Sequence, residues 1–457
     1  MAIESINPAT SELIREYPEM SHEEVGRALE VLADGFGRWR RVPLQERAAR
    51  LTTVAGLLRE RTDRYSWIMT QEMGKPLKDS RAEIEKCAWV CEYYAENGAA
   101  FLAEELVETE ATESLIGYQP LGTVLAVMPW NFPFWQFFRF GAAALMAGNT
   151  VALKHSSNVT GCALEIEQLM ADAGFSDDVF RVLVVGGRRI AEIIDRPEIS
   201  AATLTGSTPA GRSLAEACGR NLKKCVLELG GSDPYLVLED ADLEHAVTSC
   251  VTARLFNSGQ SCIAAKRFIV VEPVAEEFER RFVEAMASRT VGDPLDEATA
   301  IGPLATVDLR NELHDQVQRS IGGGAVCLLG GEVPEDPGAY YPPTVLTNVA
   351  PGTPAYEEEL FGPVAAIIRV GDEAEAIRVA NDTFFGLGGA VFTADLQRGK
   401  RIARDEIEAG CVFVNEFVRS DPRMPFGGVK GSGYGRELSY FGIREFVNVK
   451  TVWVREG

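Results

Sequence analysis

A cysteine and a glutamate stand out as the side chains best suited to chemistry. Cys262 ends the segment 256–262, FNSGQSC, and Glu228 lies 34 residues earlier at the start of ELGG, 228–231. A thiol becomes a strong nucleophile when a base or its surroundings deprotonate it, and a carboxyl group of tuned pKa can exchange protons with water. Glu228 lies in an apolar run, where an unpaired carboxylate is costly and indicates a raised pKa or a function. The alternatives are a buried structural cysteine and a partly exposed strand glutamate.

Two further segments carry polar groups beside predicted secondary structure. Asn131 lies in PWNFP, 129–133, and by residue type alone is a turn asparagine before an apolar helix. Gly206 and Ser207 begin GSTPAG, 206–211, after a predicted strand and before a predicted helix, so main-chain N–H groups there could bind a pyrophosphate. The segment lacks the GxGxxG spacing and is a weak signal on its own.

Composition excludes several classes of protein. The chain has 457 residues, enough for two or three domains, and is 46% hydrophobic and 25% charged. A net charge of −22 disfavours nucleic-acid binding. No apolar stretch is long enough to span a bilayer and no targeting segment is recognised, so we expect no membrane partner and a cytoplasmic location. Neither the four histidines nor the nine cysteines have metal-ligand spacing, and we predict no metal site.

The elements that must position these residues are helices first and then alternating strands and helices. The capping pattern at 21–24 predicts a helix, and further helices are predicted over 44–59 and 79–97. A strand-like region at 117–127 follows. Later strands and helices alternate, which predicts an α/β fold with a doubly wound parallel sheet. The predicted strands are 150–154, 182–185, 201–205, 267–271, 364–370 and 411–415, and the helices between the first of them are 162–173 and 190–194.

The order of these motifs, from NPAT at 7–10 to PFGGVK at 425–430, resembles the aldehyde dehydrogenase family. The resemblance implies an α/β fold with a Rossmann-like cofactor domain, an α/β catalytic domain and a small β-flap that joins subunits into a homodimer or homotetramer. The implied boundaries are 1–104 with 121–229 for the dinucleotide-binding domain, 230–438 for the catalytic domain, and 105–120 with 439–457 for the oligomerisation element.

The resemblance also implies roles for the three residues introduced above. Cys262 would attack an aldehyde and form a thiohemiacetal, which can lose hydride. Asn131 would donate its side-chain amide to the oxyanion, with the main-chain N–H of Cys262 as the second donor. Glu228 would be the base that activates water to hydrolyse the thioester. Relatives that transfer the acyl group to CoA typically lack this glutamate, so its presence favours release of a free acid.

Contacts with a nicotinamide dinucleotide are implied residue by residue. The matching positions are Trp130, Lys154, Ser157, Gly206, Ser207, Leu229, Glu359 and Phe361. Many NAD-preferring relatives have glutamate where Ser157 stands, and a serine removes the repulsion of a 2′-phosphate. We therefore favour NADP, with NAD as the alternative cofactor. The other interpretation of Ser157 is that it caps the following helix.

The substrate positions implied by the resemblance are Trp135, Arg139 and Ser420. An arginine in an apolar tunnel is costly unless it meets an anion, so Arg139 is predicted to bind a carboxylate at the far end of the substrate. The alternative is an ion pair with a neighbouring acidic residue. Segments 153–155, 227–234 and 423–428 look most like the bacterial branch of the family that oxidises succinate semialdehyde to succinate. Two alternatives stay open: an enzyme for another ω-carboxy or aliphatic aldehyde, and a non-catalytic binding protein on the same fold.

Overall fold

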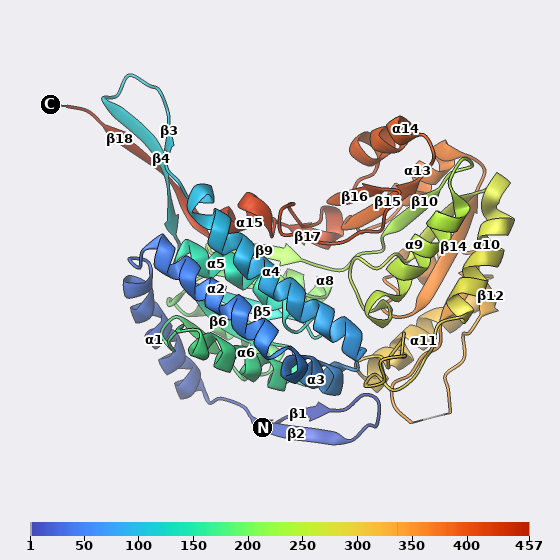
Figure 1. Ribbon diagram of the computed structural model, residues 1–457, viewed down its shortest axis with the longest axis horizontal. Coiled ribbons are helices and arrows are strands. Elements are labelled where there is room, and N and C mark those ends of the chain that lie inside the picture. The colour runs from blue at the N-terminus through green and yellow to red at the C-terminus, as the bar shows by residue number, and fades with distance from the viewer. Residues whose placement is uncertain (1, 336, 457) are drawn as a thin grey trace.

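Two largely parallel sheets form the two halves of the molecule. The computed structural model describes residues 2–335 and 337–456, and Figure 1 shows one sheet among the blue-to-green helices and the other among the yellow-to-orange ones. The first sheet has the order β17-β9-β8-β5-β6-β7. Its strands are β17 (Gly433–Tyr434), β9 (Lys224–Glu228), β8 (Ile199–Thr205), β5 (Thr123–Met128), β6 (Thr150–His155) and β7 (Phe180–Val182). Only β17 runs antiparallel to its neighbour among these described strands.

The second sheet has the order β12-β13-β14-β11-β10-β15-β16, with β12 antiparallel at one edge. Its strands are β12 (Val326–Leu329), β13 (Thr344–Thr347), β14 (Val364–Val370), β11 (Arg267–Val271), β10 (Pro234–Val237), β15 (Gly388–Phe392) and β16 (Cys411–Val414). Central strands such as β6 and β11 are buried along their whole length. This burial on both faces explains why they are continuous apolar runs and do not alternate.

Four helices precede the first sheet: α1 (His22–Trp39), α2 (Leu44–Glu60), α3 (Thr62–Met73) and α4 (Leu77–Phe101). The capping box predicted at 21–24 is confirmed, since Ser21 and Glu24 satisfy each other's main-chain N–H groups. The predictions for α2 and α4 are also confirmed, whereas α3 was not predicted. Helix α4 packs against α2, α3 and α5 (Trp135–Ala147), and this last contact brings α4 to the functional site.

The remaining helices cover the two sheets. They are α6 (Thr160–Asp172), α7 (Ile190–Asp195), α8 (Thr208–Arg220), α9 (Leu243–Leu255), α10 (Glu272–Ala287), α11 (Val307–Gly322), α12 (Pro354–Glu357), α13 (Glu373–Asn381), α14 (Leu396–Arg401) and α15 (Ser439–Glu445). One predicted strand is misplaced: the prediction was 182–185, but β7 ends at Val182. Leu183 and Val185 are buried in the core without belonging to a strand, so an apolar run alone misled the prediction.

A three-stranded sheet, in the order β18-β4-β3, extends away from both halves (Figure 1). Its strands are β3 (Glu105–Leu106), β4 (Glu113–Pro120) and β18 (Val447–Val454), while β1 (Ala2–Ile6) and β2 (Leu13–Pro18) form a separate hairpin. The predicted domain boundaries, and the role of this sheet in oligomers, stay predictions. Strand β17 lies in the range assigned to the catalytic domain but pairs with β9 of the first sheet.

Candidate active site

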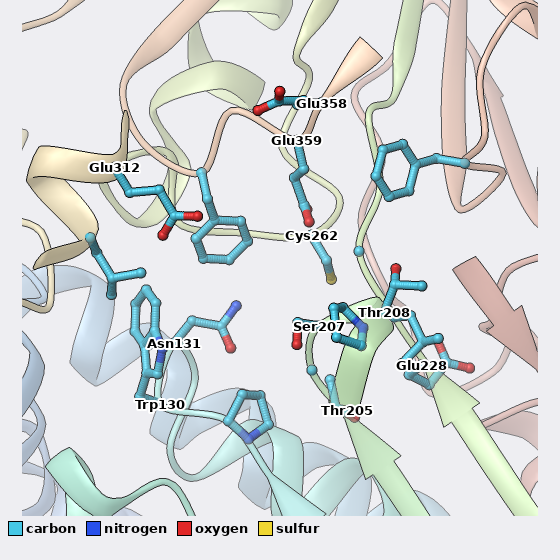
Figure 2. A pocket seen from close by; sticks show the side chains of 18 of the residues that line it. Trp130, Asn131, Thr205, Ser207, Thr208, Glu228, Cys262, Glu312, Glu358 and Glu359 are labelled. Carbon is cyan, nitrogen blue, oxygen red and sulfur yellow. The ribbon is translucent and has the colours of Figure 1, made fainter. Parts of the chain in front are cut away.

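Cys262 lies between two cavities. A larger one, of about 750 Å³, opens at the carboxyl ends of β5, β8 and β9, where the chain passes from the first sheet to the second. Ligands bind at this edge in open α/β sheets. A smaller one, of about 140 Å³, lies beside α4 and α5. Cys262 and Gln136 line both. Figure 2 shows the sulfur of Cys262 directed into the larger cavity, so the thiol can meet ligands from either side.

The loop before Cys262 has an unusual backbone that explains its small residues. Asn257, Ser258 and Gly259 have φ angles of 54°, 56° and 78°, in the left-handed region that disfavours most side chains. A Cβ atom on Gly259 would lie 2.3 Å from the main-chain oxygen of Gly362, so only glycine fits there. The side chain of Ser258 accepts a hydrogen bond of 3.0 Å from a neighbouring main-chain N–H. These constraints fix the path of the chain into Cys262.

A buried lysine that the sequence analysis missed holds the other side of this loop. The Nζ atom of Lys266 donates to the main-chain oxygens of Ser261, Cys262 and Ala264 at 3.0, 2.9 and 3.1 Å. It also pairs with Glu359 at 3.4 Å. The sequence feature that could have identified Lys266 is the presence of a lysine within the apolar run 263–271. Lys266 therefore connects the backbone of the predicted nucleophile to a residue predicted to bind the cofactor.

The surroundings of Cys262 keep its thiol protonated in this state. Burial raises the pKa of the thiol to about 12, although the positive charges of Arg139 and Lys266 act in the opposite direction. A thiol with this pKa is a weak nucleophile at neutral pH. Formation of the thiolate therefore requires a base or a change in the surroundings when ligands bind.

Asn131 is buried and its side chain is fixed from several directions. Its Nδ2 atom donates to the main-chain oxygen of Gln260 at 3.1 Å, and Gln136 donates to its Oδ1 atom at 3.4 Å. The side chain of Asn257 donates to the main-chain oxygen of Asn131 at 2.9 Å. The amide nitrogen therefore faces the loop of Cys262, as an oxyanion donor must. Asn257 and Gln136 are positioning residues that the sequence analysis did not identify.

Glu228 ends β9 and occupies a buried position. Its carboxylate forms no hydrogen bond with the described part of the chain, residues 2–335 and 337–456. Burial raises the pKa of this carboxyl group well above its usual value, although the charge of Arg139 opposes the shift. Figure 2 shows the carboxyl group directed away from the sulfur of Cys262. Burial disfavours the charged form of this carboxyl group, and the group must turn toward Cys262 to act on anything bound there.

Six of the eight predicted cofactor residues line the larger cavity: Trp130, Gly206, Ser207, Leu229, Glu359 and Phe361. Helix α8 begins beside this wall, and its first N–H groups have no acceptor inside the helix, which favours an anion such as a pyrophosphate. A Cβ on Gly211 would lie 2.6 Å from Leu229, so this glycine permits the close packing of α8. The rings of Trp130 and Phe361 meet edge to face with centroids 5.6 Å apart.

Lys154 and Ser157 do not belong to the lining of that cavity. Lys154 lies near the end of β6, where burial lowers the pKa of its ammonium group. Ser157 is half-buried in a short turn before α6, and neither this turn nor α6 shows a side-chain cap hydrogen bond in the described chain. The interpretation of Ser157 as a helix cap is therefore not supported. Contacts of both residues with a cofactor stay predictions.

The smaller cavity contains all three predicted substrate residues, Trp135, Arg139 and Ser420. Aromatic side chains form much of its remaining wall: Phe132, Phe256, Phe417 and Phe426. Arg139 forms a buried ion pair with Glu437, and its Nη2 atom donates to Thr205 at 3.1 Å. The ion pair is the alternative that the sequence left open. Binding of a substrate carboxylate by Arg139 stays a prediction.

Helix α4 contributes two side chains to the smaller cavity that were not predicted. Glu83 accepts hydrogen bonds of 2.9 Å from the main-chain N–H groups of Phe134 and Trp135, so it caps the start of α5. Lys86, one turn further along α4, donates to Ser420 at 2.7 Å. The sequence predicted the helix but could not show which helix would pack against it.

The comparisons with known proteins agree with this geometry. The sequence pattern of the aldehyde dehydrogenase family matches residues 1–452, and the chain belongs to this family. A protein of Synechocystis sp. named as a probable NADP(+) succinate-semialdehyde dehydrogenase is 50% identical over 99% of this chain and 100% of its own length. An Escherichia coli K12 protein named as an NAD(P)+ succinate semialdehyde dehydrogenase is 47% identical over 98% of this chain and 97% of its own.

A solved structure resembles this chain along its whole length. It is the succinic semialdehyde dehydrogenase of Streptococcus pyogenes in complex with NADP+, with a TM-score of 0.97, 36% identity and full coverage of both chains. The fold is therefore that of an aldehyde dehydrogenase. Within the described residues, no helix is long and apolar enough to cross a membrane, and no group of three or more acidic, histidine or cysteine side chains could hold a metal ion.

Proposed function

We propose that this chain catalyses the NADP-dependent oxidation of succinate semialdehyde to succinate. The observation that carries the proposal is the position of Cys262 between two cavities of different size and lining. A dinucleotide fits the larger cavity, with the start of α8 and the rings of Trp130 and Phe361 on its wall. A short aldehyde fits the smaller one. The names of the relatives from Synechocystis sp. and Escherichia coli support the same substrate.

In the first step the Cys262 thiol releases its proton to solvent water, and the resulting thiolate attacks the aldehyde carbonyl carbon to form a thiohemiacetal. The C–S bond forms as the carbonyl π electrons move to oxygen. Asn131 Nδ2 and the main-chain N–H of Cys262 stabilise the resulting negative charge; that N–H donates to no group in residues 2–335 and 337–456. Removing one such donor in other enzymes costs roughly a hundred- to a thousandfold in rate. Lys266 and Asn257 support this arrangement by fixing the backbone on either side.

The larger cavity has the features that a nicotinamide dinucleotide requires. The start of α8 would offer its first N–H groups to the pyrophosphate, and Glu359 and Phe361, on the wall of the same cavity, would contact a ribose and flank the nicotinamide ring. A bound nicotinamide dinucleotide would supply the hydride acceptor for the former aldehyde carbon, and loss of this hydride would leave a thioester on Cys262. The edge-to-face contact of Trp130 and Phe361 links two aromatic side chains of the same wall.

Glu228 completes the reaction by activating water. Its side chain turns from its buried position toward the thioester, and its pKa falls as the group leaves the apolar surroundings. The carboxylate then takes a proton from water while the water oxygen attacks the thioester carbon. The C–S bond breaks, succinate leaves and Cys262 is restored. Burial raises the pKa of this group, so movement into the larger cavity favours the carboxylate form that base catalysis needs.

NADP is the preferred cofactor in this proposal, with NAD as the alternative. Ser157 carries no negative charge that would repel a 2′-phosphate, and Lys154, which is buried near the end of β6 just before the turn of Ser157, supplies a positive charge. The names of the relatives from Synechocystis sp. and Escherichia coli mention NADP(+) and NAD(P)+, respectively. The chain is further proposed to act as a homodimer or homotetramer in the cytoplasm. The exposed apolar side chains of β18, such as Val449 and Trp453, support self-association.

One set of assays tests the proposal. Purified protein is given succinate semialdehyde, glutarate semialdehyde, betaine aldehyde or butyraldehyde with each dinucleotide, and reduced nicotinamide is followed by absorbance. The expected result is the highest kcat/KM for succinate semialdehyde with NADP. A higher value for an aldehyde without a carboxylate would reject the substrate and leave a dehydrogenase for aliphatic aldehydes. Light scattering after size-exclusion chromatography tests the oligomer, and cell fractionation tests the location.

A further inference from the structure

The cations around the smaller cavity differ in whether they already have an anionic partner. Lys86, Arg139 and Arg419 line this cavity. Arg139 is paired with Glu437 inside the protein, where the two side chains are only 2% and 3% exposed. Arg419 lies 3.6 Å from Glu416, and 57% of its side chain is exposed. Lys86 forms no ion pair with any residue in the ranges 2–335 and 337–456.

The immediate contacts of Lys86 are a hydroxyl and an aromatic ring. Its Nζ atom donates to Ser420 Oγ at 2.7 Å and lies 4.4 Å from the centre of the Trp135 ring. A half-buried ammonium group has lost part of its hydration. One hydroxyl and one aromatic ring do not fully replace the stabilisation that this water gave to the positive charge. Burial lowers the pKa of Lys86 to about 8, and the nearby charge of Arg139 acts in the same direction.

The acidic groups nearest to Lys86 are occupied elsewhere. Glu83, one turn before it on α4, is paired with Lys75 and also accepts from two main-chain N–H groups. Asp421 is bound by Arg423 at 2.6 Å. Neither group can neutralise Lys86 without losing its own partner. The positive charge of Lys86 is therefore available to an anion that enters the cavity.

We propose that Lys86, together with the hydroxyl of Ser420, binds the distal carboxylate of the substrate. This inference rests on the proposed function, because it assigns a receptor to the carboxylate of an ω-carboxy aldehyde. Lys86 donates to one carboxylate oxygen in a charge-assisted hydrogen bond. Ser420 accepts from Lys86, and its own O–H donates to no described residue, so this proton is free for the second oxygen.

The arrangement makes the site specific for a short substrate with two functional ends. Cys262 lines the same cavity as Lys86 and Ser420, so one molecule in it can meet the thiol at one end and the ammonium group at the other. The aromatic wall, which includes Phe256 and Phe417, suits the methylene groups between them. An aldehyde without the carboxylate would leave Lys86 without an anionic partner.

Three variants of the full-length enzyme test the inference. Lys86→Met removes the charge and keeps the length of the side chain, Lys86→Arg keeps the charge, and Lys78→Met is a matched control on an exposed turn of the same helix. The measured quantity is the ratio of kcat/KM for succinate semialdehyde to that for butyraldehyde. Lys86→Met should lower this ratio roughly ten- to a hundredfold. Lys86→Arg should keep more of the ratio than Lys86→Met, and Lys78→Met should leave it unchanged.

A binding measurement makes the result independent of the chemical steps. Succinate, the product, should inhibit the wild-type enzyme better than butyrate does, and Lys86→Met should remove this difference. An equal fall of kcat/KM on both aldehydes, with a lower melting temperature, would make Lys86 a structural residue and overturn the inference. If the wild-type enzyme itself does not prefer succinate semialdehyde, the proposed function fails. If it does and Lys86→Met keeps the preference, only the role of Lys86 fails.

Discussion

The two cavities that meet at Cys262 are built in different ways. The larger one has main-chain segments at the ends of β5, β8 and β9 on its wall, with the start of α8, together with side chains of α11 and of the segment 357–361. The smaller one is assembled from α4, α5, the loop before Cys262 and the segment 417–420. A dinucleotide can be bound largely by main-chain groups, which every sequence has, whereas a small aldehyde must be recognised by particular side chains. Selectivity for the aldehyde therefore depends on how distant segments pack.

The largest expected effect concerns the residue shared by both cavities. Cys262→Ala should lower aldehyde oxidation by at least roughly a thousandfold, because no covalent intermediate can form. Binding of NADP, measured by fluorescence titration, should change little since the proposed dinucleotide contacts are made by other residues of the larger cavity. Cys250→Ala, a buried cysteine away from both cavities, is the matched control. Substantial turnover by the Cys262 variant would reject the mechanism.

The next effect separates the two halves of the reaction. Glu228→Gln should give one rapid burst of reduced cofactor and then stop, since the thioester is not hydrolysed. Steady-state turnover should fall roughly a hundred- to ten-thousandfold, as is usual when a general base is removed. Mass spectrometry of the quenched enzyme should find the acyl group on Cys262. An enzyme that shows neither burst nor adduct would indicate that Glu228 acts earlier, as the base for the thiol.

Arg139 tests whether the smaller cavity holds a structural or a substrate-binding cation. Arg139→Leu leaves Glu437 buried without its partner, which typically costs about 3–5 kcal/mol of stability. We therefore expect a lower free energy of unfolding in urea, and similar losses of activity on succinate semialdehyde and butyraldehyde. The double variant Arg139→Leu with Glu437→Leu should regain stability. A loss confined to succinate semialdehyde would instead support the carboxylate-binding role predicted from the sequence.

The smallest effect concerns Ser157, which lies outside the lining of the larger cavity. Ser157→Glu should shift the ratio of kcat/KM for NADP to that for NAD toward NAD by roughly tenfold or more, because a carboxylate would repel the 2′-phosphate. Ser157→Ala adds no charge and should keep the wild-type preference. Kinetics with both cofactors at saturating aldehyde provide the measurement. A wild-type enzyme that already selects NAD would contradict the role given to Ser157.

Local patterns in the sequence determined much of the fold and the chemical core of the site. The capping box at 21–24 and the apolar runs of β6, β8 and β11 depend on neighbours along the chain, so they could be predicted. Cys262, Glu228 and Asn131 could be identified because each lies in a short motif that resembles those of the family. The misplaced strand at 182–185 shows the limit, since an apolar residue may be buried without belonging to a sheet.

Only the tertiary structure decided which charged side chains around the smaller cavity form pairs with each other. Lys86 and Ser420 are 334 positions apart in the chain, and their contact exists because α4 packs against α5 and the segment 417–420 closes over both. Glu437, which pairs with Arg139, comes from the far end of the chain in the same way. The sequence shows that Lys86, Arg139 and Glu437 are charged. Which charges neutralise each other, and which one is left for a substrate, follows from distances that only folding sets.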